Sequence, residues 1–400
     1  MNAIKLINIG NLVTYSSEDN SVVSLEDMEI VISDGKIIDI GRQLDVADEV
    51  FDCENKLVTP GFVDCHTHPV FLDERENEFD MRAKGYTYEE IANNGGGINN
   101  SVNGVRSSSE TELINRVTTR MNNFLKLGTT TVEAKSGYGL DLESELKSLK
   151  VLHDININHD IDIIPTFMGA HAVPLEYKND TDSYVNLLCD IIIPEVAEQG
   201  IAVFNDVFCE KGYFNLDQSE RILNKGLEYG LLPRIHADEF NNLGASKLAS
   251  SLNFVSADHL MNIDDSDIKR MAKSKTKAVL LPGTTFFLGH SNFAPYHKIK
   301  EAGIEVAIAT DYNPGSCNIQ SMIFIITVSS IFMKMDILDA IYSSTYIPAK
   351  LLNISDKCGS IENGMNADII IWDIYNPIQI PYKFSTNPIK SVIKSGKFIF

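Results

Sequence analysis

Positively charged residues are scarce in this 400-residue chain, in which 34 lysines and arginines stand against 55 aspartates and glutamates, for a formal charge of −21. A surface of that sign repels phosphate backbones and anionic lipid headgroups, so neither nucleic acid nor a membrane surface is expected as a partner. The N-terminal residues have no basic segment followed by an apolar one, so no signal peptide is expected either.

Long apolar runs and closely paired cysteines are also missing. The longest apolar stretch, residues 321–333, is interrupted by serine and threonine and is shorter than the roughly 20 residues of a membrane-spanning helix, which predicts a buried helix. The six cysteines show no CxxC spacing, which is typical of a cytoplasmic protein with free thiols. The glycine run at 95–97 lacks the GxGxxG and Walker patterns, which favours a mobile loop over a phosphate site.

Both ends of the chain have the pattern of antiparallel strands. Asp34-Gly35 and Ser395-Gly396 lie between apolar, β-branched runs, and such dipeptides are typical of hairpin turns. Near the C-terminus, Asn363-Gly364 precedes another β-branched run, ADIIIWDI.

The middle of the chain, residues 58–350, alternates between apolar strands and amphipathic helices. One helix is expected over residues 111–128, ending at Gly128, and others are expected to begin near Leu142, Asp217 and Ile263. Eight strands can be counted, the first over residues 56–68. Their nearly continuous apolar runs indicate parallel strands that are buried on both faces. The pattern predicts an α/β fold with a closed (β/α)8 TIM-type barrel, and an open doubly wound sheet is the alternative.

Polar residues follow the carboxyl ends of these strands. His66 and His68 end the first strand and point to one face of it, because side chains alternate along a strand. In a barrel all such strand ends meet at one face. Several side chains are therefore expected to share one pocket, with the third, fifth, sixth and eighth strands supplying His171, His236 and Glu239, His259, and Asp311.

Imidazole and carboxylate groups in this arrangement suit a borderline divalent ion such as zinc. We take the metal ligands to be His66, His68, His236 and Asp311. Glu239 and His259 are the candidates for proton transfer. Glu239 could instead be a carboxylate that complements a helix dipole, and His259 could instead be a structural histidine.

Three further residues are candidates for substrate contact. Arg75 follows the first strand and could hold a carboxylate with its planar guanidinium group. Tyr138 and His171 lie in the loops expected after the second and third strands.

Five motifs in the order HTH, GAH, HADEF, ADHL and ATDYNPGS resemble the amidohydrolase superfamily. Together with KSGYG and GGGI they resemble its imidazolonepropionase family, over about residues 58–320. The resemblance implies ring-opening hydrolysis of 4-imidazolone-5-propanoate to N-formimidoyl-L-glutamate in histidine degradation. It also implies one Zn²⁺ or Fe³⁺ ion per subunit that activates the attacking water, and a cytoplasmic homodimer.

The same resemblance assigns residues and domains. The metal would be held by the four ligands named above. The substrate would be held by Arg75, Tyr138, His171 and Glu239, and the product by Asn313, Gly315 and Ser316. Residues 1–57 and 351–400 would form a small β-rich domain beside the barrel of residues 58–350. In the implied mechanism, His259 positions the water and Glu239 carries a proton to the ring nitrogen.

Two alternatives stay open on the sequence alone. A cytosine- or guanine-type deaminase of the same superfamily would use the same ligand set, although Arg75 and the KSGYG and TDYNPGS loops favour a substrate with a carboxylate tail. A metal-free scaffold protein could also have kept the barrel, but it would have no need of the complete ligand and proton-transfer set.

Overall fold

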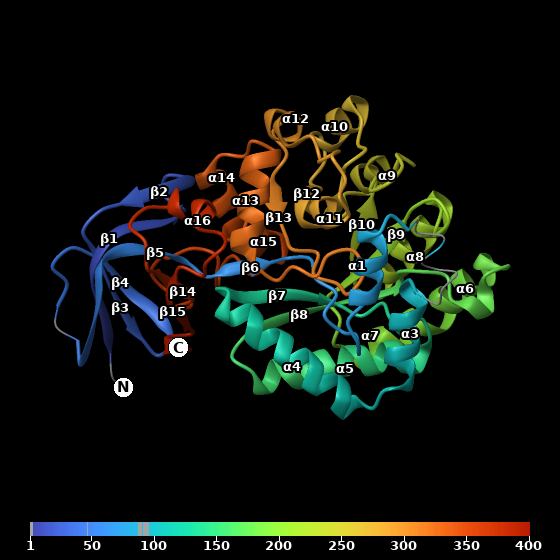
Figure 1. Cartoon of the computed structure of the whole chain (residues 1–400), viewed down its shortest axis with the longest axis horizontal. Coiled ribbons are helices and arrows are strands. Elements are labelled where there is room, and N and C mark those ends of the chain that lie inside the picture. The colour runs from blue at the N-terminus through green and yellow to red at the C-terminus, as the bar shows by residue number, and fades with distance from the viewer. Residues whose placement is uncertain (1–2, 46, 87–89, 91–95) are drawn as a thin grey trace.

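The computed structural model describes residues 3–45, 47–86, 90 and 96–400. Figure 1 shows two parts, a helix-wrapped barrel and a smaller sheet that combines strands from both ends of the chain. The barrel strands are β6 (Phe62–Asp64), β7 (Thr129–Lys135), β8 (Asp162–Ala170), β9 (Phe204–Cys209), β10 (Leu232–Ala237), β11 (Ser256–His259), β12 (Lys277–Leu280) and β13 (Val306–Ile308).

All neighbouring barrel strands are parallel and follow one another in chain order from β6 to β13. The barrel closes just beyond its first and last strands, where Thr67 and Tyr312 form a parallel bridge. There the Asp311 N–H donates to the His66 carbonyl at 3.0 Å, and the His68 N–H donates to the Tyr312 carbonyl at 2.8 Å. The predicted (β/α)8 barrel is therefore confirmed, and the open sheet is not observed.

The helices surround the barrel and cover its sheet (Figure 1). They are α1 (Glu76–Ala83), α3 (Ile98–Ser107), α4 (Glu110–Lys126), α5 (Leu142–Asn158), α6 (Thr181–Leu187), α7 (Ile193–Gln199), α8 (Leu216–Glu228), α9 (Ala245–Leu252), α10 (Asp265–Met271), α11 (Pro282–Phe287), α12 (Tyr296–Glu301), α13 (Met322–Phe332), α14 (Ile337–Tyr342), α15 (Tyr346–Leu351) and α16 (Gln379–Tyr382).

Helix α4 shows why the local sequence pattern predicted a helix correctly. It begins at a capping box in which Ser109 accepts from the Glu112 backbone N–H and Glu112 accepts from that of Ser109. It buries Leu113, Val117 and other apolar residues on one face, and Gly128 follows its end with a φ of 86°. The apolar stretch at 321–333 forms helix α13, which is buried over most of Met322–Ser329 as expected, while Ile331 and Phe332 at its end are exposed. Among the helices of the described ranges, none combines the length and hydrophobicity needed to cross a bilayer.

The smaller sheet places the two chain ends side by side. Its strands are β1 (Ile4–Ser16), β2 (Ser21–Leu25), β3 (Met28–Ser33), β4 (Lys36–Gly41), β5 (Glu49–Pro60), β14 (Ile369–Trp372), β15 (Ile389–Lys394) and β16 (Lys397–Phe398). The predicted hairpins at Asp34-Gly35 and Ser395-Gly396 are present, with positive φ at all four residues as a type I′ turn requires. β5 lies inside the sheet, between β1 and β14.

The predicted strand over residues 56–68 is wrong in one respect, because it is two strands in two different sheets. β5 ends at Pro60 in the smaller sheet, and β6 begins at Phe62 in the barrel. Gly61 joins them at a point with no room for a side chain, since a Cβ there would lie 2.3 Å from the Thr130 Oγ1 atom. A second link is Lys394 of β15, which pairs with Asp368 at 2.7 Å and with Asp162 at the start of β8 at 2.6 Å.

Candidate active site

The predicted metal ligands lie together at the carboxyl end of the barrel. The Nε2 atoms of His66 and His68 are 3.3 Å apart, and each lies 3.4 Å from the Asp311 Oδ1 atom. Two donors bound to one ion at about 2.1 Å and at a tetrahedral angle lie roughly 3.4 Å apart. These three atoms therefore have the mutual spacing of ligands that share one ion.

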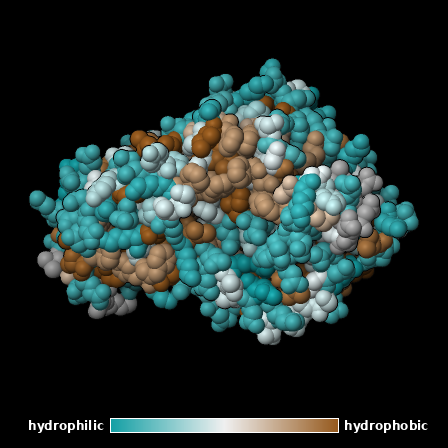
Figure 2. Space-filling view, viewed as in Figure 1, coloured by the Kyte–Doolittle hydropathy of each residue, from teal (hydrophilic) through white to brown (hydrophobic). Residues whose placement is uncertain are grey.

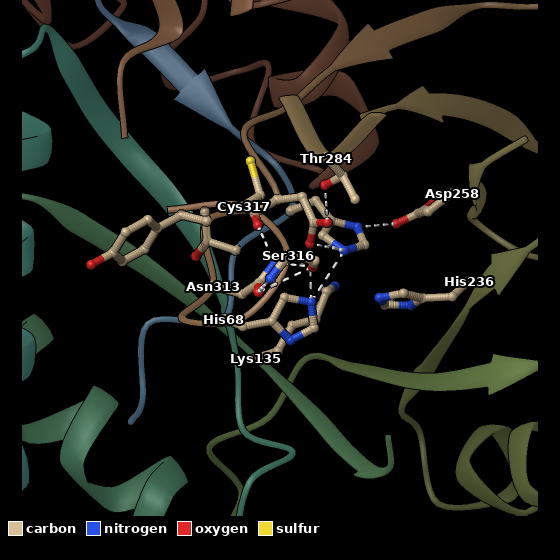
Figure 3. Close-up of polar contacts among 12 residues, drawn as sticks. His68, Lys135, His236, Asp258, Thr284, Asn313, Ser316 and Cys317 are labelled. Carbon is tan, nitrogen blue, oxygen red and sulfur yellow. Dashed lines mark hydrogen bonds and ion pairs between the residues drawn. The ribbon is translucent and has the colours of Figure 1, made fainter. Parts of the chain in front are cut away.

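His236 and His259 complete the cluster from β10 and β11. The His236 ring centroid lies 4.5 Å from that of His66 and 5.5 Å from that of His68. One ring nitrogen from each of His66, His236 and His259 lies within 4.8 Å of the others. Figure 3 shows the His68 and His236 rings facing a common centre. The structure thus brings the four predicted ligands together and adds His259 beside them.

Carboxylates behind the ligands fix how the imidazole rings are oriented. The His66 Nδ1 atom lies 2.7 Å from an Asp258 oxygen, and the His236 Nδ1 atom lies 3.0 Å from an Asp206 oxygen. Such contacts hold the proton on Nδ1 and leave Nε2 as the lone-pair donor. Asp311 is held in turn by the Thr284 hydroxyl, which donates to its Oδ2 atom at 2.5 Å.

A set of charged residues under the histidines was not predicted from the sequence, and we call it the buried charge network. It consists of Glu133, Lys135, Asp206, Arg234 and Asp258, all with fully buried side chains. Lys135 pairs with Asp206 at 3.0 Å and with Glu133 at 2.7 Å. Arg234 pairs with Glu133 at 3.4 Å and with Asp258 at 2.7 Å. A continuous series of ion pairs therefore joins the carboxylate behind His236 to the one behind His66.

A signal for the network was present in the sequence as charged residues inside apolar strands. Glu133 and Lys135 are two residues apart in β7, and Arg234 precedes His236 by two in β10, so each pair shares a strand face. Asp258 and His259 are consecutive, yet both contact the site. His259 has a φ of 79°, an uncommon value for a residue other than glycine, which breaks the strand alternation there.

The carboxylates of this region outnumber its cations. Asp311 and the three carboxylates of the network stand against Lys135 and Arg234, which leaves a net charge of −2 when all six are ionised. Burial opposes ionisation, but cations and imidazoles nearby more than offset it, so the pKa of each of the four carboxyls lies below its ordinary value. An uncompensated charge of −2 in a buried site fits a divalent cation.

A cavity of about 550 Å³ opens beside the cluster. Every residue predicted to contact substrate or product lines this cavity, namely Arg75, Tyr138, His171, Glu239, Asn313, Gly315 and Ser316. Residues that the sequence analysis did not single out also line it, among them Arg82, Tyr86, Ile98, Phe208, Tyr213, Phe240, Leu288 and His290.

Tyr138 and His171 form one wall of the cavity. The His171 ring stacks on that of His68 at 4.9 Å, and the Tyr138 ring lies 5.1 Å from that of His171. The loop that carries Tyr138 is held from below by Glu145 of α5, whose buried carboxylate accepts the N–H groups of Gly137, Gly139 and Leu140. These rings therefore stand on a fixed support.

Arg75 and the loop of residues 313–316 form another part of the cavity wall. Arg75 is bound by both oxygens of Glu78, at 2.8 and 2.6 Å. Its guanidinium packs on Gly315, where an added Cβ would lie 2.5 Å from the Arg75 Nη1 atom. Asn313 shapes the loop, because its Oδ1 atom accepts the N–H groups of Gly315 and Ser316 at 2.9 and 2.7 Å.

Glu239 is a buried carboxyl at the cavity wall, and one of its oxygens lies 3.6 Å from the His259 Nε2 atom. Burial, together with the charges of Asp311 and Glu210, raises the pKa of Glu239 well above its ordinary value. A raised pKa makes this carboxyl a stronger proton acceptor than an exposed glutamate, which suits a group that moves protons. Glu239 precedes α9 by six residues and lies outside the first turn of that helix, so the helix-dipole alternative has no support.

Two further features of the sequence, His290 and the glycine run at 95–97, can be compared with the structure. His290, which was not among the predicted site residues, lies in the cavity wall. Of the glycine run expected to form a mobile loop, Gly95 lies outside the described residues, and Gly97 immediately precedes α3 and donates its N–H to Glu78.

Comparison with known proteins agrees with this geometry. Residues 234–399 match the model of the amidohydrolase family. The chain is 43% identical over 389 residues to an imidazolonepropionase of Brevibacillus brevis, covering 95% of this chain and 92% of the relative. An imidazolonepropionase of Geobacillus kaustophilus is 42% identical over 384 residues, covering 94% and 90%.

Solved structures share the fold at low sequence identity. A zinc-bound adenosine deaminase from Xanthomonas campestris superposes with a TM-score of 0.73 and 16% identity, over 99% of this chain and 92% of that one. A guanine deaminase from C. acetobutylicum superposes with a TM-score of 0.68 and 18% identity, over all of both chains. At such identities the likeness shows the fold alone. The identity to the curated relatives, over nearly the whole chain, shows more: this chain belongs to the imidazolonepropionase family of the amidohydrolases.

Proposed function

We propose that this chain hydrolyses the ring C–N amide bond of 4-imidazolone-5-propanoate, giving N-formimidoyl-L-glutamate in histidine degradation. The main support for the proposal is the set of side chains that line one cavity. The cavity is lined by a cluster of potential metal ligands, by the Glu239 carboxyl with its raised pKa and by the guanidinium group of Arg75. The relatives named imidazolonepropionase support the same activity.

A metal ion belongs to this site, and we propose that His66, His68, His236 and Asp311 hold it. The spacing of three of their donor atoms and the net charge of −2 fit one divalent ion, and imidazole with carboxylate suits zinc. Iron as Fe³⁺ remains the alternative from the family resemblance. When bound, such an ion lowers the pKa of a water molecule and polarises a carbonyl oxygen.

Glu239 transfers the protons during hydrolysis. Water adds to the ring carbonyl carbon, the bond from that carbon to the ring nitrogen breaks, and one proton of the water ends on that nitrogen. Glu239 can carry this proton because its carboxyl is buried beside the histidine cluster and its pKa is raised. His259 lies within 3.6 Å of Glu239 and beside His236, where it orients the water and stabilises the developing oxyanion.

The residues of the cavity walls orient the substrate. Arg75 binds the propanoate arm, and Tyr138 and His171 hold the ring against His68. The loop of Asn313, Gly315 and Ser316 lies where the released product would contact it. Binding energy from the arm then orients the carbonyl for attack.

The test is an assay on 4-imidazolone-5-propanoate that is generated enzymatically just before use. Its ultraviolet absorbance should disappear with the purified protein and persist when a chelator has removed the metal. Persistent absorbance with the metal-loaded protein would contradict the proposal. Ammonia release from cytosine or guanine would instead identify the deaminase alternative, which the full-length relatives do not favour.

We also propose a cytoplasmic homodimer. All six cysteines are unpaired and buried, which suits a reducing compartment. Phe286, Phe324, Phe332 and Phe384 form a chain of ring contacts, and Phe286, Phe332 and Phe384 are exposed. Figure 2 shows hydrophobic residues gathered over α13 and its neighbours. A patch of this kind marks an interaction surface, and light scattering coupled to size-exclusion chromatography would report the subunit count.

A further inference from the structure

The arginine side of the cavity contains two guanidinium groups and one carboxylate. Both oxygens of Glu78 are bound by Arg75, and one of them also accepts the Gly97 N–H at 2.9 Å. Glu78 is buried, and although burial raises its pKa, Arg75 and then Arg82 lower it below its ordinary value, so it is a carboxylate. The charge of Arg75 is therefore already matched inside the protein.

Arg82 is the second guanidinium, and it has no acidic hydrogen-bond partner among the described residues. It lies in the last turn of α1, seven residues after Arg75, which is the N-cap residue of that helix. Its Nη2 atom donates to the Gly315 carbonyl at 2.8 Å. Its Nε atom is buried and has no hydrogen-bond partner in the described part of the chain. A buried N–H of a charged group without a partner is costly, so Arg82 retains unused hydrogen-bonding capacity at the cavity wall.

The two arginines meet at one residue of the cavity wall. The Arg75 guanidinium packs against the Cα atom of Gly315, and Arg82 is bonded to the carbonyl of the same glycine. All three residues line the cavity that also contains Glu239. Arg75, Arg82 and Glu78 together carry a net charge of +1, which one substrate carboxylate would neutralise.

We infer that Arg82 is a second carboxylate-binding residue, which selects substrates whose ring carries an anionic arm. This inference rests on the proposed function, since it concerns the arm of the same substrate. Arg75 is oriented by Glu78, and Arg82 supplies a positive charge that has no carboxylate hydrogen-bonded to it among the residues that the structure describes. The two arginines would hold one carboxylate from two sides, because hydrogen bonds between a guanidinium group and a carboxylate are strengthened by their opposite charges.

The experiment compares two non-reactive ligands that differ in charge alone. Imidazole-4-propanoate carries the anionic arm, and imidazole-4-propanamide has a neutral arm of nearly the same shape. Isothermal titration calorimetry measures both dissociation constants for the metal-loaded wild type, Arg82→Gln and Arg82→Lys. Arg116→Gln, which removes an exposed arginine of α4, controls for the loss of one positive charge from the protein.

The wild type should bind the propanoate more tightly than the propanamide, and Arg82→Gln should weaken propanoate binding by roughly tenfold or more. The propanamide constant should change by less than about twofold, which also shows that the variant is folded, and Arg82→Lys should fall between. Equal losses for both ligands, or no loss for either, would overturn the inference. If the wild type binds neither ligand and does not open the imidazolone ring, the proposed function itself is wrong.

Discussion

The Lys135 Nζ atom lies 3.0 Å from one oxygen of Asp206, and the other oxygen of that carboxylate lies 3.0 Å from the ring Nδ1 atom of His236. A lysine with no accessible surface thus contacts the carboxylate that orients His236, one of the proposed metal ligands. Lys135 is drawn near His68 and His236 in Figure 3, and it is not among the residues that line the cavity. The relationship makes the lysine part of the support for the site rather than part of its chemistry.

Replacing Lys135 with Met should destabilise the protein strongly. The change leaves Glu133 and Asp206 buried without their common cation, and breaking a buried pair costs about 3–5 kcal/mol. Urea unfolding of the metal-free protein measures the free energy directly. Lys397→Met is the matched control, because Lys397 is exposed in its pair with Asp160 and such pairs contribute about 1 kcal/mol or less. Equal losses for the two variants would contradict the role given to the network.

Metal binding should raise the thermal stability of the protein. The metal-free site carries an uncompensated charge of −2, so an ion that binds only the folded state adds about 4 kcal/mol when present at 1,000 times its dissociation constant. Differential scanning calorimetry with and without zinc should show this as a rise in Tm.

Asp258→Asn is the informative variant for the same measurement. The substitution weakens the hold on the His66 ring, and loss of such a partner typically costs 10–100-fold in metal affinity. The variant should therefore show a smaller rise in Tm at the same zinc concentration. A rise as large as that of the wild type would remove Asp258 from the ligand support.

Glu239→Gln should abolish proton transfer while keeping the metal. Glutamine has nearly the same shape but cannot exchange a proton, so kcat should fall by about 100-fold or more. Metal content, measured by atomic emission, should not change, because Glu239 is not among the proposed ligands. Glu301→Gln, at an exposed position of α12, should keep wild-type kcat. Near-normal turnover of the metal-loaded Glu239→Gln variant would disprove the shuttle.

Substitutions of Arg75 and Gly315 should have coupled, non-additive effects on KM. Arg75→Ala should raise KM by removing a guanidinium from the arm of the substrate. Gly315→Ala should have a similar effect, because its Cβ would occupy space 2.5 Å from the Arg75 Nη1 atom and displace the guanidinium. In a double-mutant cycle on KM, the alanine at position 315 should cost little once Arg75 is gone. Additive effects would mean that Gly315 acts independently of Arg75.

Alkaline pH should destabilise the fold through its buried thiols. Burial raises the pKa of Cys53 and Cys358 to about 12 and that of Cys209 to about 11, from 9.0 when exposed. Above pH 9 the unfolded chain loses these protons while the folded chain keeps them, so the free energy of unfolding falls as pH rises. Each thiol contributes up to about 1.4 kcal/mol per pH unit.

Urea unfolding between pH 8 and pH 10.5 measures this dependence. Cys53→Ala should show a shallower decline than the wild type, because one titrating thiol has been removed. The comparison of slopes separates the thiol from lysines and tyrosines that titrate in the same range. An identical slope would mean that Cys53 does not contribute.

The barrel could be predicted from sequence because each strand is an apolar run that needs burial on both faces. The gathering of His66, His68, His236 and Asp311 followed from that fold alone, since parallel strands of a barrel bring their carboxyl ends to one face. No distance between these residues had to be known. The periodicity of helix α4 and its end at Gly128 were equally local properties.

The sequence could not show which charges pair beneath the site. Lys135 and Asp206 are far apart in sequence and lie on β7 and β9, which do not neighbour each other in the barrel. Whether they meet depends on strand register and on which side chains point inward, and neither is determined by a single apolar run. The break at Gly61 was hidden for a similar reason, since residues on both sides are apolar and buried and nothing in the pattern says that they belong to different sheets.

The Gly61 junction also makes the far end of the chain relevant to catalysis. β5 is flanked by β14, the Gly61 N–H is bonded to the carbonyl of Asp368, and two residues later the chain is inside the barrel and approaching His66. The last thirty or so amino acids thus anchor the segment that delivers two of the reactive imidazoles. Trimming the C-terminus, or crowding it with a bulky fusion partner, would disturb the geometry of hydrolysis from the opposite side of the molecule.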